Sequence, residues 1–245
     1  MNDLEKFFHD NQGNMITKWD SYFEVYDRHF SKFRGKDVVI VEVGVYHGGS
    51  LKMWKNYFGD KAQIIGIDIN PECKKFEEDN IKIYIGSQED RSFLTQLKQL
   101  APKIDILIDD GGHSMKQQIT TFEEMYHHLS KDGVYLCEDV HTSYFEEFGG
   151  GYKKQDTFIE FTKNHIDELN AWHSRNKNEL DVTEFTGTTK SIHFYDSIVV
   201  FEKGELKRPE SLVSGEKSIK LKNEMSFMEK VTSYLKRYWY RYFKK

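Results

Sequence analysis

The residues of this chain best suited to chemistry are two pairs of acids, each standing directly after an apolar run. They are Asp109 with Asp110, after the run IDILI, and Glu138 with Asp139, after the run VYLC. His113 stands three residues beyond the first pair. Carboxylate oxygens are the preferred ligands of hard cations such as Mg²⁺, and a neutral imidazole is suited to general-base work. The pattern predicts a metal-assisted transferase rather than a simple binding domain.

Apolar runs alternate with helical patterns along the chain and predict the elements that position these acids. Strands are expected over 38–43, 63–69, 81–85, 104–108, 134–137, 191–195 and 197–202. Helices are expected over 50–58, 91–100, 116–129 and 157–170, and one more is expected after the strand 63–69. Aromatic residues recur at helical spacing through 1–33 with an interruption near Gly13. The alternation predicts a parallel sheet with right-handed crossovers. The last two runs stand too close together for a crossover and predict a hairpin.

The expected fold class is α/β, a Rossmann-like doubly wound, mostly parallel seven-stranded sheet with a terminal antiparallel hairpin. Five strand–helix units followed by such a hairpin resemble the class I S-adenosylmethionine (SAM) methyltransferases. In a doubly wound sheet, ligands sit beyond the carboxyl ends of the strands, where the strand order reverses. Both acidic pairs are expected at that edge.

A glycine-rich turn, EVGVYHGGS over 42–50, follows the first expected strand and predicts a cofactor there. Glycine at a turn lets the backbone approach a ligand without a Cβ in the way. Asp68, which ends the second strand, is placed to accept hydrogen bonds from two ribose hydroxyls. The tighter G-x-G-x-x-G of dinucleotide-binding turns is missing, and Glu42 would face a pyrophosphate with the wrong sign. These features favour SAM over a nicotinamide cofactor.

The segment GSQED, residues 86–90, follows the third strand, where this class of fold recognises adenine. Gln88 and Asp90 are the candidates, because an amide or acidic side chain can accept from the exocyclic amine. Ser87 or Asp90 can equally cap the next helix. Asp109 is either a contact on the cofactor side or an ordinary loop charge. The predicted cofactor-binding residues are Glu42, Gly44, Gly48, Ser50, Asp68, Gln88, Asp90 and Asp109.

The sequences IDILIDDGGHS and GVYLCEDVHTSYF resemble the metal-dependent sugar O-methyltransferases of macrolide biosynthesis, the mycinamicin 2″-O-methyltransferase type, over about 38–151. This resemblance implies that Asp110, Glu138 and Asp139 bind Mg²⁺ and that His113 is the general base. Gly112 is a departure, because relatives often have serine there, but it is no ligand. In the following loop, His141 and Tyr144 are candidate contacts to the acceptor, or they only pack.

The resemblance implies a SAM- and Mg²⁺-dependent O-methyltransferase that acts on a sugar hydroxyl of a glycan or a glycosylated natural product. A sugar hydroxyl is a poor nucleophile, so a cation and a base together suit it. One alternative is a catechol-type O-methyltransferase. A catechol needs less help from a histidine, so the pair Glu138 and Asp139 with His113 favours the sugar. Another alternative is a non-catalytic SAM-binding partner in polysaccharide assembly.

Composition and charge limit the other classes of function. The 245 residues include 38% hydrophobic residues, enough for one compact domain with appendages, divided as 1–35 (helical), 36–203 (methyltransferase domain) and 204–245 (tail). From residue 203 onward there are 12 basic and five acidic residues, so this end carries +7 and residues 1–202 carry -12 of the net -5. An acidic body argues against a nucleic-acid partner. Two cysteines and no secretory apolar run lead us to expect a cytoplasmic protein.

The basic tail reads SFMEKVTSYLKRYWYRYFKK from Ser226 and predicts an amphipathic helix. Basic helices rich in Tyr and Trp can lie on anionic membrane surfaces. Docking onto the domain or onto another subunit of a homo-oligomer, and disorder, are the alternatives. A membrane-bound tail would make a lipid-linked glycan a plausible acceptor and would place the protein peripherally at the inner face of the membrane.

Overall fold

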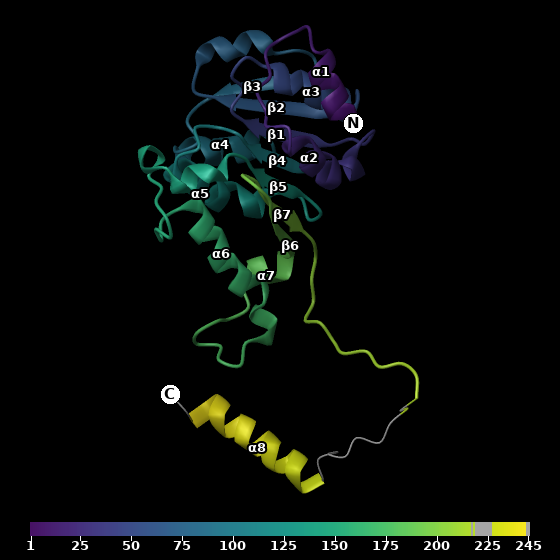
Figure 1. Ribbon diagram of the computed structural model, residues 1–245, viewed down its shortest axis with the longest axis vertical. Coiled ribbons are helices and arrows are strands. Elements are labelled where there is room, and N and C mark those ends of the chain that lie inside the picture. Colours follow the sequence, from purple (N-terminus) through teal and green to yellow (C-terminus); the bar gives the residue numbers. More distant parts are fainter. Residues whose placement is uncertain (217, 219–226, 244–245) are drawn as a thin grey trace.

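The computed structural model describes residues 1–216, 218 and 227–243, and its centre is one seven-stranded sheet (Figure 1). The strands are β1 (Val39–Val43), β2 (Gln63–Asp68), β3 (Ile81–Ile85), β4 (Ile106–Asp109), β5 (Val134–Cys137), β6 (Thr189–Phe194) and β7 (Val199–Lys203). Their order in the sheet is β3-β2-β1-β4-β5-β7-β6. Strands β1 to β5 are parallel, and β7 runs antiparallel to both of its neighbours. The predicted fold class is confirmed.

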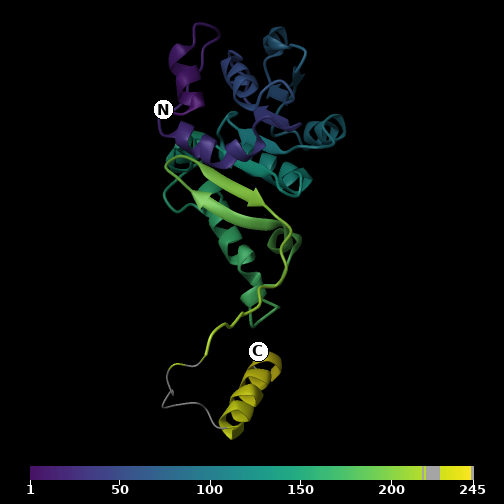
Figure 2. The same cartoon turned by 90° about the vertical axis from the view of Figure 1, so that its right-hand side faces the viewer.

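Helices lie on both faces of this sheet, and the C-terminal helix stands apart from it (Figures 1 and 2). They are α1 (Asp3–Asp10), α2 (Tyr22–Phe30), α3 (Gly49–Phe58), α4 (Arg91–Leu100), α5 (Met115–Met125), α6 (Phe158–Leu169), α7 (Glu184–Thr188) and α8 (Phe227–Phe243). Alternate residues of a strand point to opposite faces, and β1 shows the division. Ile40 packs with buried residues of α1, α2 and α3, whereas Val41 packs with buried residues of α4, α5 and α6.

The strand order reverses at β1. From β1 the chain goes to β2 and β3 on one side, and then returns to β4 on the other side of β1. The carboxyl ends of β1 and β4 therefore flank a crevice at the topological switch point. Ser114 begins α5 directly after His113, with a capping box formed with Gln117. The helix start thus fixes the loop that carries the predicted base.

The structure differs from the sequence-based expectations in three places. A 3₁₀ helix over Pro71–Phe76 replaces the α-helix expected after β2. The terminal hairpin is formed by β6 and β7, with bounds slightly shifted from those expected and with Ser197 in its turn at φ 61°. Between α1 and α2, residues 11–19 have no regular structure, a longer interruption than the one expected near Gly13. We call residues 11–19 the strap.

The C-terminal helix α8 stands apart from the sheet in both views (Figures 1 and 2). The expected tail helix is confirmed over Phe227–Phe243, and Ser226, Lys244 and Lys245 lie outside the described residues. None of the helices in the described ranges combines the length and the apolar character needed to cross a bilayer.

Candidate active site and cofactor cavity

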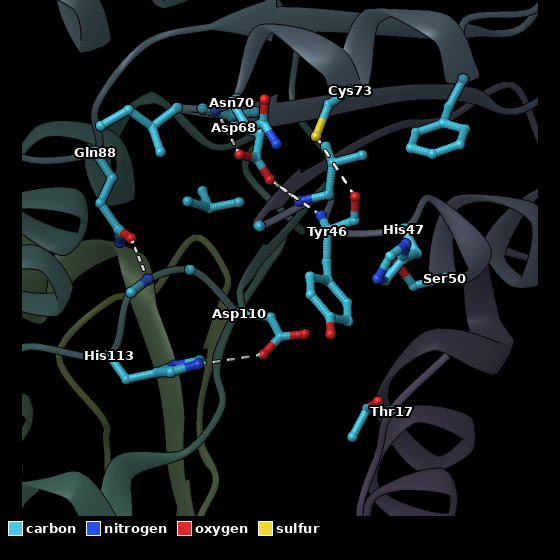
Figure 3. A pocket seen from close by; sticks show the side chains of 18 of the residues that line it. Thr17, Tyr46, His47, Ser50, Asp68, Asn70, Cys73, Gln88, Asp110 and His113 are labelled. Atoms are coloured by element: carbon cyan, nitrogen blue, oxygen red, sulfur yellow. Dashed lines mark hydrogen bonds and ion pairs between the residues drawn. The ribbon is translucent and has the colours of Figure 1, made fainter. Parts of the chain in front are cut away.

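A cavity of about 750 Å³ opens at the carboxyl ends of β1, β2 and β4. Its size lies within the range of small-molecule sites. The turn after β1, the ends of β2 and β3, the loop after β4 and the strap all contribute to its walls. In Figure 3, Asp110 and His113 lie on one side of the cavity, and Thr17 of the strap lies on another.

Two positions of the glycine turn require glycine, because other residues approach the backbone closely there. Gly44 has φ +95°, and a Cβ placed on it would overlap the carbonyl oxygen of Asp110. Gly48 has φ +74°, and a Cβ there would lie 2.7 Å from the ring of Phe76. The sequence-based reason for these glycines was the approach of a ligand. Gly44 does line the cavity. In the structure, however, the absence of a side chain at both glycines lets other residues of the chain pack closely against the turn.

Asp68 lines the cavity, and its carboxylate accepts hydrogen bonds from backbone amides of the glycine turn. Its Oδ2 accepts hydrogen bonds from the amides of Val45 at 2.9 Å and Tyr46 at 3.0 Å, and its Oδ1 accepts one from the amide of Asn70 at 2.8 Å (Figure 3). Each carboxylate oxygen has further lone pairs, so Asp68 can still accept from a ligand. Its role toward the ribose stays a prediction.

Glu42 is buried beneath the cavity and is not part of its wall. It accepts hydrogen bonds from Ser50 Oγ at 2.7 Å and from Trp54 Nε1 at 2.9 Å. Burial raises the pKa of Glu42 to about 7, although the nearby Lys18 ammonium opposes this shift. Glu42 is thus separated from the cavity by Ser50 in this arrangement, and its predicted contact with the cofactor stays a prediction. Ser50, its hydrogen-bond donor, does line the cavity.

Gln88 and Asp90 are predicted to contact adenine and Asp109 to contact the cofactor, and one of these three residues lines the cavity. Gln88 does so, and its Oε1 accepts a hydrogen bond from the Gly112 amide at 2.8 Å. Its Nε2 donates to Asp109, which is only 1% exposed and lies outside the cavity wall. Asp90 also lies outside the wall and caps α4, accepting from the amides of Ser92 and Phe93. Asp90 therefore has the capping role that the sequence left open, and the cofactor contacts predicted for Asp90 and Asp109 stay predictions.

Asp110, His113 and Asp139 converge at the rim of the cavity. One ligand atom from each lies within 4.8 Å of the other two. His113 Nε2 is 3.5 Å from Asp139 Oδ2 and 4.0 Å from Asp110 Oδ1. Two carboxylates facing a shared space suit a hard divalent cation, and the buried Nδ1 of His113 has no hydrogen-bond partner among the described residues. The donor set fits Mg²⁺ with an imidazole beside it.

The backbone is strained at this rim. Tyr46, His113 and Asp139 have φ of 50°, 56° and 53°, in the left-handed region that few residues other than glycine adopt. Strain of this kind persists where surrounding contacts hold it, and it gathers at functional sites. All three residues line the cavity.

Lys18 of the strap is the residue that sequence reasoning missed. Its ammonium is 2% exposed, pairs with Asp110, and lies 2.8 Å from Glu138 Oε2 and 4.0 Å from Glu42 Oε1. Burial alone would lower the pKa of Lys18, but the three carboxyl groups raise it above its ordinary value. Burial and the charge of Asp110 also raise the pKa of Glu138. Negative charge is thus in excess here, which favours the binding of a cation.

Two tyrosines of α2 support the second acidic pair from behind. Tyr22 donates a hydrogen bond to Asp139, and Tyr26 Oη donates one of 2.7 Å to Glu138 Oε1. Burial raises the pKa of both hydroxyls, so both remain donors. Glu138 does not belong to the converging group of Asp110, His113 and Asp139. Its predicted role as a third metal ligand stays a prediction.

An aromatic surface adjoins this rim on the outer side. The rings of Trp19 and His141 lie 5.3 Å apart, and Phe145 packs against His141 at 5.4 Å. His141 Nδ1 is within hydrogen-bond distance of Ser197 Oγ, at 2.9 Å. Trp19 and Tyr144 are about half exposed, at 50% and 52%. Neither His141 nor Tyr144 lines the cavity, and their predicted contact with the acceptor stays a prediction.

Comparison with known proteins agrees with this geometry. Residues 41–140 match a family described as a methyltransferase domain. The chain is 32% identical over 196 residues to the 8-demethyl-8-alpha-L-rhamnosyl tetracenomycin-C 2'-O-methyltransferase of Streptomyces olivaceus, covering 76% of this chain and 51% of that protein. It is also 32% identical to the mycinamicin VI 2''-O-methyltransferase of Micromonospora griseorubida, covering 73% of this chain and 47% of that protein.

A solved structure shows the same likeness. The MycE methyltransferase of the mycinamycin biosynthetic pathway, in complex with Mg and SAH, superposes with a TM-score of 0.74 at 28% identity. The match covers 83% of this chain and 54% of that chain. This chain therefore spans about half the length of the curated relatives that it matches.

Proposed function

We propose that this chain, which belongs to the class I methyltransferases, transfers the methyl group of SAM to a sugar hydroxyl. The sugar is part of a glycan or of a glycosylated natural product. One observation carries the proposal. Two carboxylates and an imidazole, those of Asp110, Asp139 and His113, converge at the rim of a cavity whose other wall holds Asp68 and the glycine turn. Base and cation site thus adjoin the place for a cofactor.

Asp110 and Asp139 would hold Mg²⁺, with Glu138 as the third ligand in the sequence-based assignment. SAM would lie along the turn 44–47, with its ribose toward Asp68. When bound, Mg²⁺ supplies Lewis-acid chemistry that makes a sugar hydroxyl more acidic, and SAM supplies the methyl group. The chain's own contribution is to place the acceptor oxygen in line with that methyl, which removes translational freedom from the reaction.

His113 is the proposed general base. Its Nε2 faces the space between the two carboxylates, where the hydroxyl of the acceptor would stand. A neutral Nε2 accepts the hydroxyl proton, and the adjacent carboxylates of Asp110 and Asp139 stabilise the imidazolium that results. The strained backbone of His113 aims the ring at this space.

The acceptor class rests on the relatives and on the aromatic surface. The two relatives are 2'-O- and 2''-O-methyltransferases of glycosylated natural products. In this chain, the half-exposed ring of Trp19 offers a flat apolar face beside His141, whose Nδ1 lies 4.0 Å from Oδ1 of Asp139. Sugars present apolar C–H faces that pack on such rings. We infer that the sugar to be methylated lies against Trp19.

The test is methyl transfer from labelled SAM to a panel of rhamnosides and other glycosides, with catechol as the competing acceptor class. We expect transfer to a glycoside that stops in EDTA and returns with Mg²⁺. His113→Ala should lose at least about a hundredfold in rate while it still binds SAH. His9→Ala, on the exposed face of α1, is the control. Full activity of Asp110→Asn in EDTA, or transfer to catechol alone, would contradict the proposal.

The tail supports a further part of the proposal, that α8 binds an anionic membrane surface. Met228, Tyr234 and Leu235 are 59–70% exposed, and Lys236 and Arg237 beside them are exposed too. Apolar and aromatic side chains next to basic ones match the interfacial region of an anionic bilayer. The helix stands apart from the sheet (Figure 1), although Lys236 and Arg237 also line a hollow shared with residues 173–176.

Co-sedimentation of the full chain with vesicles tests the membrane contact. Binding should need anionic lipid, weaken with salt, and fall when Lys236 and Arg237 are both replaced by Glu. A matched reversal of Lys131 and Lys153, two basic residues outside the tail, should leave binding unchanged. Equal sedimentation with purely zwitterionic vesicles would contradict an electrostatic contact, and a dimer that masks the tail would favour docking between copies.

A further inference from the structure

The strap is an irregular segment that forms part of the cavity wall. Met15, Ile16, Thr17 and Lys18 all line the cavity, and Thr17 is seen opposite His113 in Figure 3. A ligand in the cavity would therefore touch residues that no helix or strand holds in place. What fixes the strap then decides how well the cavity is formed.

The strap lies directly on the first turn of α3. A Cβ placed on Gly49 would overlap the carbonyl oxygens of Asn14 and Met15, so the backbone of the strap runs where a side chain would otherwise stand. Gly49 has an ordinary helical backbone conformation. Glycine is therefore needed here because it has no side chain, and not because its backbone is more flexible. The contact is tight but van der Waals in kind, and it supplies no directional anchor.

Lys18 supplies that anchor. Its ammonium donates to Asp110 after β4 and to both oxygens of Glu138 after β5, at 3.0 and 2.8 Å for Glu138. Among the described residues, the other hydrogen bonds of the strap stay within residues 8–22. Lys18 is thus the hydrogen-bonded link from the strap to the loops of the sheet. The Lys18 side chain is only 2% exposed, so water screens its interaction with the two carboxylates little.

We propose that Lys18 is the latch of the strap, a positioning residue that closes the cofactor cavity by tying residues 11–19 to Asp110 and Glu138. This inference rests on the proposed function, because it takes the cavity to be the cofactor site. Lys18 touches the carboxylates and is enclosed by them, so it positions the strap and the two acids instead of taking part in proton transfer. Loss of the latch should open the wall that faces the cofactor.

The test measures SAH binding by calorimetry in EDTA, so that neither metal nor acceptor enters the result. Lys18→Met keeps the length of the side chain and removes its charge. We expect its SAH dissociation constant to rise about tenfold or more, and chymotrypsin to cleave after Trp19 several times faster. Lys98→Met, which removes a lysine paired with Glu124 on the surface, is the matched control and should change neither value.

Removing Lys18 alone leaves Glu138 buried without its cation, which can impair folding. The double variant Lys18→Met with Glu138→Gln removes both charges, and it should fold and still bind SAH weakly. Gly49→Ala displaces the strap without changing any charge, and it should have the same two effects. If Lys18→Met and the double variant bind SAH as wild type does and resist chymotrypsin equally, the latch is wrong. If the wild-type protein itself fails to bind SAH, the proposed function fails instead.

Discussion

The hydroxyl of Tyr22 donates a hydrogen bond of 2.5 Å to Oδ1 of Asp139, so a helix near the N-terminus orients a carboxylate of the reaction centre. Residues that orient metal ligands commonly change metal affinity by about 10–100-fold when they are replaced. We therefore expect Tyr22→Phe to weaken Mn²⁺ binding by about tenfold, measured by electron paramagnetic resonance of the free ion. SAH binding should stay near the wild-type value.

Tyr57→Phe is the matched control for that variant. Its hydroxyl also donates to an aspartate, Asp27, at 2.7 Å, but that pair lies away from the cavity. Mn²⁺ affinity should not change in this variant. An equal loss in both variants would indicate a general effect on the fold, and no loss in Tyr22→Phe would show that Asp139 needs no support.

We expect replacement of Trp19 to weaken binding of the acceptor without slowing the transfer of the methyl group. The half-exposed ring of Trp19 stands beside His141. Trp19→Ala should raise KM for a glycoside acceptor about tenfold and leave kcat within a few-fold, because the lost contact is equally strong in the ground state and the transition state. Trp19→Phe should restore part of the affinity. Tyr152→Ala, at an aromatic residue that is 80% exposed, should change neither constant. A fall in kcat alone would place Trp19 in the chemistry.

Cys73 offers a chemical probe of the cavity. It lines the cavity, and burial together with Asp68 raises the pKa of its thiol from 9.0 to about 11. At about pH 8 its thiolate should be about a hundredfold scarcer than that of an ordinary thiol, so iodoacetamide should label it slowly, and faster as the pH approaches 11. SAH should slow labelling further. Cys137, buried in β5, serves as the silent reference in mass spectrometry. Rapid labelling at pH 8 would be inconsistent with this environment.

A buried histidine far from the cavity predicts a pH dependence of stability. His29 Nδ1 lies 3.0 Å from Glu202 Oε1, and its Nε2 lies 2.9 Å from Tyr195 Oη. Burial lowers the pKa of His29 below 6.5, although Glu202 opposes this shift. The unfolded chain therefore binds more protons between the two pKa values, so stability falls as the pH drops below about 6.5. Because the raised pKa of the buried Glu42 acts on stability in the opposite direction, the fall is measured as the difference in melting temperature between the wild type and His29→Gln from about pH 8 to 5.

His29→Gln should flatten that pH dependence, because it removes the titrating group and keeps hydrogen-bonding capacity. His9→Gln, at an exposed position of α1, should keep the wild-type slope. If the wild type instead gains melting temperature relative to His29→Gln as the pH drops from about 7 to 5, the ion pair with Glu202 outweighs burial and the pKa of His29 is raised instead of lowered.

Local pattern was enough to predict the sheet. Continuous apolar runs mark the strands, and their alternation with helices predicts parallel pairing. The acids after β4 and β5 therefore fall at one edge of the sheet without any knowledge of distant contacts. The same pattern left Asp90 open between a cap and a ligand contact. The choice depends on the direction of one side chain at the start of α4, which spacing along the chain does not specify.

Lys18 could not be found in this way. It lies in a segment with no periodicity, 92 residues from Asp110 and 120 from Glu138, and a lone lysine is usually exposed. The aromatic residues Tyr22 and Tyr26 fit the pattern of packing residues on a helix, and their hydroxyl contacts are a tertiary property. A lysine beside a tryptophan in a break between two aromatic helices was the available signal.

The hydroxyls of Tyr22 and Tyr26 have a consequence for how this protein can be divided. A boundary drawn at residue 36 keeps every strand, yet it cuts away both donors and Lys18. The first 35 residues and the acids at 138 and 139 therefore depend on each other structurally. A chimera that exchanges this leading stretch with that of a relative would bring foreign partners to its own carboxylates, and recombination between such enzymes should preserve the two parts together.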